Sequence, residues 1–231
     1  MSIPLHTILH IPKTGGSTLR YYVTRHLPAG TVLELYNNES PDEVKQRIAA
    51  FDPLLRACVG VVIGHDVFYG IHDCFDRPAQ YYTMLREPLS RMQSAFNYHV
   101  DTGRLSPPHR ANAEQEFASF FSSNRPANVI NRFLVKRGFL NESVEHAKSD
   151  ISSYFEECCR RFHFIGLTER SPHDFRFILG RCGVTPWYIA RKNRTHYTNH
   201  LSLNATIREQ FLQHHSLDDA LYRYVLSRQA I

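Results

Sequence analysis

The stretch His10-Ile11-Pro12-Lys13-Thr14-Gly15-Gly16-Ser17-Thr18-Leu19 joins an apolar run to a helical pattern. The run 7–11 predicts a short buried parallel strand, and the apolar spacing from residue 17 onward predicts a helix. Two adjacent glycines let the backbone bend tightly and bring its N–H groups close to an anion, and the helix N-terminus turns its positive end toward the same space. The stretch therefore predicts a phosphate-binding loop.

Polar side chains of the same stretch fit an anion. Lys13 supplies a mobile positive charge, and Thr14, Ser17 and Thr18 supply hydroxyl donors. The lysine precedes the glycines, whereas in the Walker pattern it follows the second glycine, which argues against a nucleoside-triphosphate site. The alternative interpretation is that the glycine pair only forms a turn.

The order strand, Pro-Lys-Thr-Gly-Gly-Ser-Thr-Leu, helix resembles the phosphosulfate loop of sulfotransferases that use 3′-phosphoadenosine 5′-phosphosulfate (PAPS). The resemblance is strongest to the carbohydrate group that includes heparan sulfate 2-O-sulfotransferases. It implies a single α/β domain over residues 1–231, with a central, mainly parallel sheet flanked by helices in a P-loop NTPase-like sulfotransferase fold. It also implies that the cofactor is bound by Pro12, Lys13, Thr14, Gly15, Gly16, Ser17 and Thr18.

Composition sets limits on the fold and the partners. The chain has 231 residues, of which 42% are hydrophobic and 21% charged, which excludes disorder and fits one large α/β domain or at most two small ones. A net charge of +5 suits an anionic nucleotide or acceptor but is too mild and dispersed to indicate nucleic-acid binding. The sequence does not indicate an oligomeric state.

Targeting signals and metal motifs are both missing from the sequence. No apolar run approaches the ~18 residues of a membrane span, and the N-terminus lacks a signal-peptide pattern. We therefore expect a cytoplasmic chain with no membrane partner; a trimmed luminal domain of a Golgi enzyme would look the same. Five cysteines without paired metal spacing predict free thiols and no metal site.

His65 is the candidate general base. The apolar run 58–63 predicts a buried parallel strand, and ligands of such sheets bind beyond the carboxyl ends of the strands. A neutral imidazole there can take a proton from a hydroxyl. The alternative is a histidine that only bonds a loop, and His72 and Asp66 are reserve candidates. The Gly-His pair is similar to the family's catalytic pattern, although the 2-O group has a second histidine where this chain has Ile63.

Arg86 and Ser94 form a second candidate anion site. The run 80–85 predicts a third strand, after which Arg86 offers a five-donor fork and Ser94 a hydroxyl two turns into the next helix. A surface ion pair is the alternative for Arg86. The pattern Leu85-Arg86-Glu87-Pro88 with Ser94-Ala95-Phe96 resembles the family's 3′-phosphate motif, with Glu87 in place of the usual Asp. The resemblance implies that Arg86 and Ser94 hold the 3′-phosphate.

The later part of the chain contributes weaker signals. The segment 190–195 carries Arg191, Lys192 and Arg194, which read as a solvated basic loop or, by resemblance, as a segment that closes over the nucleotide. Residues 101–112 form an acceptor-binding loop or a connector. Helices are expected over 41–51, 114–121, 128–136, 143–161, 174–181 and 203–213, with a fourth strand over 162–167. Capping boxes are expected at Ser40 and Glu43 for the helix over 41–51 and at 216–219 for the last helix.

These motifs together predict transfer of a sulfuryl group from PAPS to a hydroxyl, with a carbohydrate as the expected acceptor. In this hypothesis Lys13 neutralises the leaving group, His65 deprotonates the acceptor, the nucleotide product is 3′-phosphoadenosine 5′-phosphate (PAP), and no metal takes part. Two alternatives remain: a P-loop kinase-like phosphotransferase, and a non-catalytic module that binds glycan or nucleic acid. Phe68, Tyr69, Trp187 and Tyr188 line an acceptor in one interpretation and belong to the core in the other.

Overall fold

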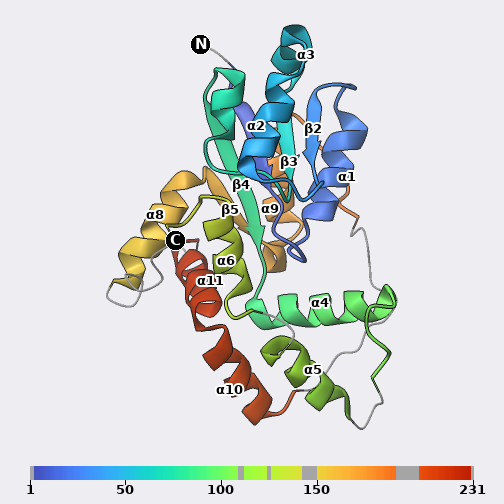
Figure 1. The fold of residues 1–231 in the computed structure, drawn as a ribbon, viewed down its shortest axis with the longest axis vertical. Helices are drawn as coiled ribbons and strands as arrows, with labels where there is room; N and C mark the ends of the chain where they lie inside the picture. Colours follow the sequence, from blue (N-terminus) through green and yellow to red (C-terminus); the bar gives the residue numbers. More distant parts are fainter. Residues whose placement is uncertain (1–2, 109–111, 124–125, 142–149, 191–202, 230–231) are drawn as a thin grey trace. The chain divides into compact units, whose positions relative to one another are not determined.

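The computed structural model describes residues 3–108, 112–123, 126–141, 150–190 and 203–229. The chain divides into two compact units (Figure 1). The sheet unit comprises Met1–Leu85 and Phe133–Lys192, and the helical unit comprises Arg86–Arg132 and Asn193–Ile231. Each unit is described by itself.

The sheet unit is built on five parallel strands in the order β2-β3-β1-β4-β5. Their bounds are Leu5–Leu9 for β1, Val32–Leu35 for β2, Val61–Gly64 for β3, Ala79–Leu85 for β4 and Phe164–Leu167 for β5. The central strand β1 places Ile8 opposite Ile63 of β3 on one side and Tyr82 of β4 on the other. The predicted α/β fold with a central parallel sheet flanked by helices is confirmed.

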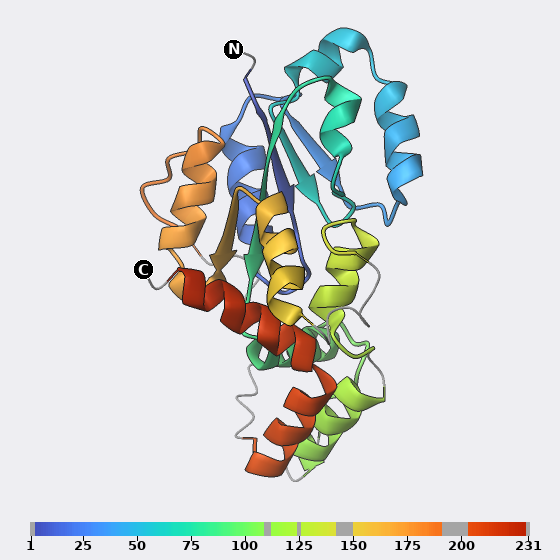
Figure 2. The ribbon, with the colours of Figure 1, turned by 90° about the vertical axis from the view of Figure 1, so that its left-hand side faces the viewer.

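Helices cover both faces of this sheet. Their bounds are Gly16–His26 for α1, Pro41–Ala49 for α2, Pro53–Cys58 for α3, Ile151–Arg161 for α8 and His173–Arg181 for α9, with short 3-10 turns η1 (Ile71–Phe75) and η3 (Thr168–Arg170). Figure 2 shows α1 and α9 on one side of the sheet and α2 and η1 on the other. Right-handed connections explain this arrangement. The chain first moves from β1 outward to the edge strand β2, which places α1 on one face of the sheet. It then moves back through β3 toward β5, which places α2 and η1 on the other face.

The face under α1 and α9 is closed by an apolar core. Ile8, Ile63 and Tyr82 of the sheet are fully buried there. The two helices cover them with Leu19, Tyr22 and Val23 from α1 and Phe175, Ile178 and Leu179 from α9. This packing holds the start of α1, and with it the loop that precedes it, against the sheet.

The helical unit contains α4 (Pro88–Asp101), α5 (Ala113–Ser122), α10 (Ala205–His214) and α11 (Ser216–Arg228), together with the first residues of α6 (Val129–Lys136). Its core is aromatic: Phe96 packs edge-on against Phe117 and Phe120, and Phe121 against Phe211, with ring centroids 5.3–5.6 Å apart. Such edge-to-face pairs stabilise the packing beyond their buried area.

The structure corrects two predicted boundaries. The strand expected over 58–63 begins only at Val61, because residues 53–58 form α3, whose first turn is capped by Asp52 through a 2.8 Å bond to the Leu54 N–H. The described part of the helix expected over 143–161 begins at Ile151, and residues 142–149 lie outside the described ranges.

The capping box expected at residues 216–219 is wrong. Ser216 lies inside α11, and the residue that precedes this helix makes no side-chain cap. The carboxylate of Asp218 instead accepts from the backbone N–H groups of Ile130 and Asn131, at 3.0 and 2.9 Å, and so caps the first turn of α6. The predicted capping box at Ser40 and Glu43 of α2 is confirmed.

Two further observations are limited to the described ranges. No helix there combines the length and the apolar character that crossing a membrane requires. The five cysteines, Cys58, Cys74, Cys158, Cys159 and Cys182, are all free, as predicted.

A buried ion pair links three parts of the sheet unit. The carboxylate of Asp66, just beyond β3, pairs with the guanidinium of Arg137, and their side chains are only 1% and 2% exposed. Arg137 also donates to the carbonyl oxygen of Glu39 at 2.9 Å, and the Asp66 N–H donates to Leu35 O at 3.1 Å. The pair therefore ties the end of β3 to the end of β2 and to the chain after α6.

Replacing Arg137 by Gln should destabilise the protein strongly. The change leaves the Asp66 carboxylate buried without its counter-ion, and removal of one partner from a buried pair costs about 3–5 kcal/mol of unfolding free energy. The matched control is Arg160→Gln, which breaks an exposed pair with Glu156 on α8 and should cost less than about 1 kcal/mol. Urea unfolding followed by circular dichroism measures both; equal losses would contradict the structural role of Asp66.

Candidate functional site

The loop between β1 and α1 requires glycine at two positions. Gly15 precedes α1 in a left-handed conformation with φ +90°, and a Cβ there would lie 2.7 Å from Cζ of Phe175 on α9. A Cβ on Gly16 would lie 2.0 Å from Cδ2 of the His10 ring. Neighbouring side chains therefore occupy the space beside both glycines, which is a stronger constraint than a simple turn would impose.

Hydrogen bonds hold the carbonyl groups of this loop. The hydroxyl of Thr14, a fully buried residue, donates to Ile11 O at 2.8 Å, so this hydroxyl shapes the loop from within. The Thr168 hydroxyl, just beyond β5, lies 2.8 Å from Thr14 O and 2.9 Å from Leu85 O at the end of β4. The loop is thus anchored to the carboxyl ends of two other strands.

The remaining loop residues expected to bind the cofactor lie in the same turn. Pro12, Lys13 and Ser17 are half-buried, Thr18 is buried, and Lys13 has a left-handed backbone with φ 70°. The N–H of Thr18 already donates to Gly15 O at 2.9 Å in the first turn of α1. Because the first N–H groups of a helix have no partner within it, the backbone around Gly16 and Ser17 is suited to hold an anion.

His65 lies beside this loop in a defined tautomer. It follows β3, which is the neighbour of β1 in the sheet, and its Nδ1 lies 2.5 Å from the carbonyl oxygen of His10. A carbonyl oxygen only accepts, so Nδ1 carries the proton and donates it. In the neutral ring Nε2 is therefore unprotonated and carries the lone pair with which a general base accepts a proton.

A second histidine and a tyrosine complete this cluster. The rings of His10 and His65 have centroids 4.3 Å apart, and His10 Nδ1 is 2.9 Å from the hydroxyl of Tyr36. Tyr36 meets His65 edge-on at 4.9 Å and carries the Arg20 guanidinium 4.5 Å above its ring. Arg20 is also paired with Glu34. The His65 ring thus contacts His10 and Tyr36, which directly follow β1 and β2, and Arg20 of α1 contacts Tyr36.

Burial keeps both histidines neutral. Desolvation lowers the pKa of His10 well below its usual value, and the positive charges of His65, Arg20 and Lys13 act in the same direction. Desolvation also lowers the pKa of His65, although the bond to His10 O and the charge of Asp66 oppose it. Burial raises the pKa of Tyr36, so it remains a phenol. At neutral pH His65 is therefore available to accept a proton.

The reserve candidates for the base are committed elsewhere. Asp66 is held in the buried pair with Arg137. His72 lies in η1, where its Nδ1 is 2.8 Å from the hydroxyl of Tyr81 and its Nε2 is 3.5 Å from Asp73. Within the described residues, His65 is the candidate whose ring bonds the carbonyl group of His10, directly before the glycine loop.

Arg86 and Ser94 belong to the helical unit. Arg86 directly follows the last residue of β4, and Ser94 lies half-buried in α4. Between them the Glu87 carboxylate accepts from the N–H groups of Leu89 and Ser90, at 3.0 and 2.7 Å, and caps the helix. Glu87 thus starts the helix that carries Ser94. Arg191, Lys192 and Arg194 lie outside the described residues, as does part of the segment 101–112.

Two contributors escaped the sequence-based prediction: His10 and Tyr36. They directly follow β1 and β2, at the carboxyl edge of the sheet. The rule that singled out His65 would have found them if it had been applied to every strand. In the described residues no group of three His, Cys, Asp or Glu side chains is arranged to hold a metal ion.

Comparison with known proteins gives matches among solved structures only. No family model matches the chain, and no curated protein matches it. A sulfotransferase from Alicyclobacillus acidocaldarius has a TM-score of 0.48 at 14% identity, over 97% of this chain and 96% of that one. Mouse sulfotransferase SULT7A1, crystallised with PAP, has a TM-score of 0.38 at 15% identity, over 93% of this chain and 65% of that one. The site has to be judged on its own residues.

Replacing Gly16 by Ala should disturb His65 as well as the loop. The new Cβ conflicts with the His10 ring, and overpacking of this kind costs about 1–3 kcal/mol of unfolding free energy. His10 would have to move, which should loosen the Nδ1 bond of His65, visible as a shifted His65 imidazole ¹⁵N resonance. Gly180→Ala is the control, because its Cβ meets nothing within 4 Å on α9. An unchanged His65 resonance in Gly16→Ala would contradict the coupling.

Proposed function

We propose that this chain transfers a sulfuryl group from PAPS to a hydroxyl acceptor. The observation that carries the proposal is the bond from His65 Nδ1 to His10 O, because it puts a base with a free Nε2 directly beside a glycine loop suited to an anion. A glycine loop without a base would bind the nucleotide but would not deprotonate the acceptor. A base without the loop would have no bound sulfuryl donor beside it.

The glycine loop is proposed to hold the phosphosulfate end of the donor. Backbone N–H groups at the start of α1 surround the 5′-phosphate, and Lys13 neutralises the charge that develops on the departing oxygen. Arg86 and Ser94 are proposed to bind the 3′-phosphate on the basis of their sequence motif, and Arg191, Lys192 and Arg194 to close over the nucleotide. The 3′-phosphate contacts would distinguish PAPS from ATP.

The proposed reaction is a direct displacement at sulfur. The acceptor oxygen forms a bond to sulfur while the bond from sulfur to the 5′-phosphate oxygen breaks, and PAP leaves with that electron pair. The acceptor proton passes to Nε2 of His65, whose positive charge is then stabilised by the carbonyl oxygen of His10 at Nδ1. Like phosphoryl transfer, the step should run in line through a loose transition state.

A carbohydrate is the proposed acceptor, following the motif resemblance of residues 12–19 and 85–96; a hydroxyl on another small molecule fits the same step. A kinase-like phosphotransferase is disfavoured because Lys13 precedes the glycines. A non-catalytic binding module is disfavoured because it has no need of a half-buried histidine held in one tautomer beside the loop.

His65→Ala should lower kcat by about 10²–10⁴-fold with PAPS and a glycan acceptor, because a positioned general base contributes that much. The control is His26→Ala, an exposed position in the last turn of α1. In the wild type, kcat/KM should fall as pH decreases, since protonation removes the base, and the midpoint should lie below 6.5 because burial lowers the pKa of His65. A His65→Ala variant with unchanged kinetics would remove the residue from the mechanism.

Isothermal calorimetry with PAP and with ATP plus Mg²⁺ should distinguish the donors. We expect PAP to bind more tightly, and Arg86→Ala to weaken PAP binding by roughly 10–100-fold, since hydrogen bonds to charged groups have about that strength. Lys13→Ala should mainly lower kcat. Arg223→Ala, an exposed arginine paired with Asp219 in the helical unit, is the matched control. Preference for ATP and Mg²⁺ would favour the phosphotransferase instead.

A further inference from the structure

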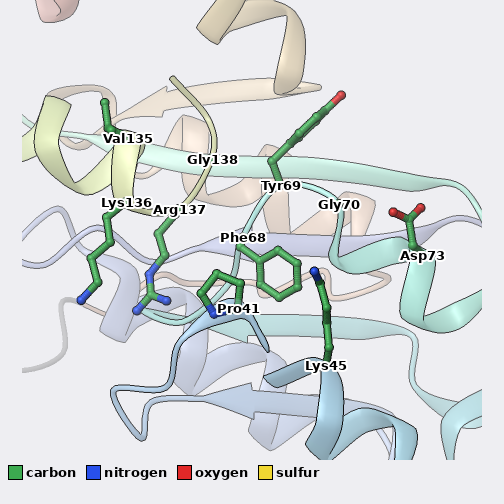
Figure 3. Close-up of a pocket in the computed structure, with 10 residues that line it drawn as sticks. All are labelled: Pro41, Lys45, Phe68, Tyr69, Gly70, Asp73, Val135, Lys136, Arg137 and Gly138. Carbon is green, nitrogen blue, oxygen red and sulfur yellow. The ribbon is translucent and has the colours of Figure 1, made fainter. Parts of the chain in front are cut away.

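The glycine loop lies apart from the pocket of the sheet unit shown in Figure 3. That pocket has a volume of about 330 Å³ and lies between α2, the loop that follows β3 and the end of α6. Its lining includes neither His65 nor any residue of the glycine loop. The groups that an anion would meet in the loop are therefore oriented by the hydrogen bonds of the loop and by the segments that contact it.

The peptide group between Thr14 and Gly15 is the part of the loop that could turn over. Gly15 has φ +90° and ψ 4°. If this peptide group turned over, φ of Gly15 would become about −90° with ψ still near 0°, which is an allowed conformation. Glycine adopts both signs of φ about equally readily, so Gly15 itself favours neither orientation. The orientation is therefore decided by hydrogen bonds.

The hydroxyl of Thr168 holds the carbonyl side of this peptide group. It lies 2.8 Å from Thr14 O and 2.9 Å from Leu85 O. Both carbonyl oxygens only accept, so the hydroxyl donates its one proton to them in a shared, three-centre bond. In a planar trans peptide group the C=O and the N–H point in opposite directions. The N–H of Gly15 is therefore turned away from Thr168.

The position of Thr168 is fixed by the sheet. Leu167, the residue before it, lies opposite Leu85 in the register of β5 on β4. The N–H of Leu167 donates to the carboxylate of Asp174 at 2.8 Å, and Asp174 is fully buried in the first turn of α9. The hydroxyl of Thr168 thus reaches the loop from a well-anchored point at the end of β5.

The orientation of the Thr14–Gly15 peptide group decides whether the loop offers converging N–H groups. The next peptide group is fixed by α1, because Gly15 O accepts from the N–H of Thr18 at 2.9 Å. A left-handed residue followed by a helical one directs successive N–H groups into one concave site that suits an anion. Gly15 and Gly16 have this sequence of conformations. Among the described residues, no backbone hydrogen bond uses the N–H of Gly15.

We propose that Thr168 is a positioning residue of the anion site, whose hydroxyl holds the Thr14 carbonyl group so that the N–H of Gly15 faces the 5′-phosphate of the nucleotide. The identity of the anion rests on the proposed function, whereas the orientation of the peptide group does not. In the opposite orientation the carbonyl oxygen of Thr14 would replace this N–H and repel a phosphate. Thr168 acts through the loop and touches no ligand itself.

Thr168→Val keeps the shape of the side chain and removes the hydroxyl. In titrations of ¹⁵N-labelled protein we expect it to weaken PAP binding about 10-fold, since hydrogen bonds to charged groups contribute that much. Binding of adenosine 3′-phosphate, which lacks the 5′-phosphate, should be unchanged. Thr168→Ser keeps the hydroxyl and should bind PAP as the wild type does. Undiminished PAP binding by Thr168→Val, or an equal loss for both nucleotides, contradicts the proposal.

The matched control is Thr31→Val. Thr31 is half-buried like Thr168, and its hydroxyl also donates to a backbone carbonyl oxygen at 2.8 Å, that of Pro28. It lies between α1 and β2, outside the glycine loop. This variant loses a hydrogen bond of the same kind and should bind PAP as the wild type does. A loss of PAP binding equal to that of Thr168→Val would mean that general destabilisation is the cause, and the proposal would fail.

The amide resonance of Gly15 reports the peptide orientation without any ligand. In Thr168→Val the two orientations should exchange, and ¹⁵N relaxation dispersion should detect this exchange at Gly15. The wild type and Thr31→Val should lack it. A Gly15 resonance in Thr168→Val that neither shifts nor shows exchange would contradict the proposed role of the hydroxyl.

The outcome for Thr168 is separable from the outcome for the proposed function. If the wild type binds PAP and Thr168→Val binds it equally well, only the role of Thr168 is overturned. If the wild type fails to bind PAP, the sulfotransferase proposal is overturned, and titration with inorganic pyrophosphate decides the role of Thr168. A Gly15 amide shift that needs more pyrophosphate in Thr168→Val than in the wild type supports that role, and any other response overturns it.

Discussion

The hydrogen bond from His65 to the carbonyl oxygen of His10 is the contact on which the candidate site depends. His10 directly follows β1, and its N–H donates to Gly64 O of β3 at 2.9 Å, so its carbonyl group is held in place at the end of the central strand. A backbone carbonyl oxygen can only accept a hydrogen bond, so Nδ1 of His65 has to be the protonated nitrogen. The backbone at the end of the central strand therefore determines which nitrogen of the proposed base carries the lone pair.

The close approach of His10 and His65 affects the protonation of both rings. Two imidazole rings 4.3 Å apart cannot both carry a charge without repulsion, and burial opposes the charge on each. His10 is the more deeply buried and has the Lys13 charge near it, so its protonation is the more strongly disfavoured. The Tyr36 hydroxyl bonds its Nδ1. His10 is thereby kept as a neutral neighbour, and any proton taken up by the pair goes to His65.

Much of the fold followed from the sequence because apolar periodicity and helix caps are local signals. The strand, loop and helix around residues 7–23 and the capping box at Ser40 were predicted from residues adjacent in the chain. The early start of β3 was missed because Asp52 and Pro53 begin a short helix inside an apolar stretch. The role of Asp218 was missed because its carboxylate caps a helix 87 and 88 residues away, and no local pattern reveals such a partner.

In the candidate site, too, features with a local sequence signal were predicted, and features that depend on residues far apart in the chain were missed. The glycine loop and His65 were predicted from their places after strands, but the reason for Gly16 was not, because the obstacle to a side chain there is the His10 ring. Ile63, where the heparan sulfate 2-O group that the motifs resemble has a second histidine, faces the apolar core in this chain. A second imidazole lies beside His65 nonetheless, from His10, which directly follows β1. Sequence position alone does not reveal this neighbour, since only strand pairing brings residues 10 and 65 together.

The surroundings of His65 bear on the proposed chemistry as well as on its tautomer. Desolvation that keeps His65 neutral also disfavours the imidazolium that would form if it took the acceptor proton. The hydrogen bond to the carbonyl oxygen of His10 and the charge of Asp66 raise the pKa of His65, while the Arg137 charge beside Asp66 lowers it again. The bond to His10 is the largest of the contributions that favour the charged ring, so the contact that sets the tautomer of the proposed base also supports its proton affinity.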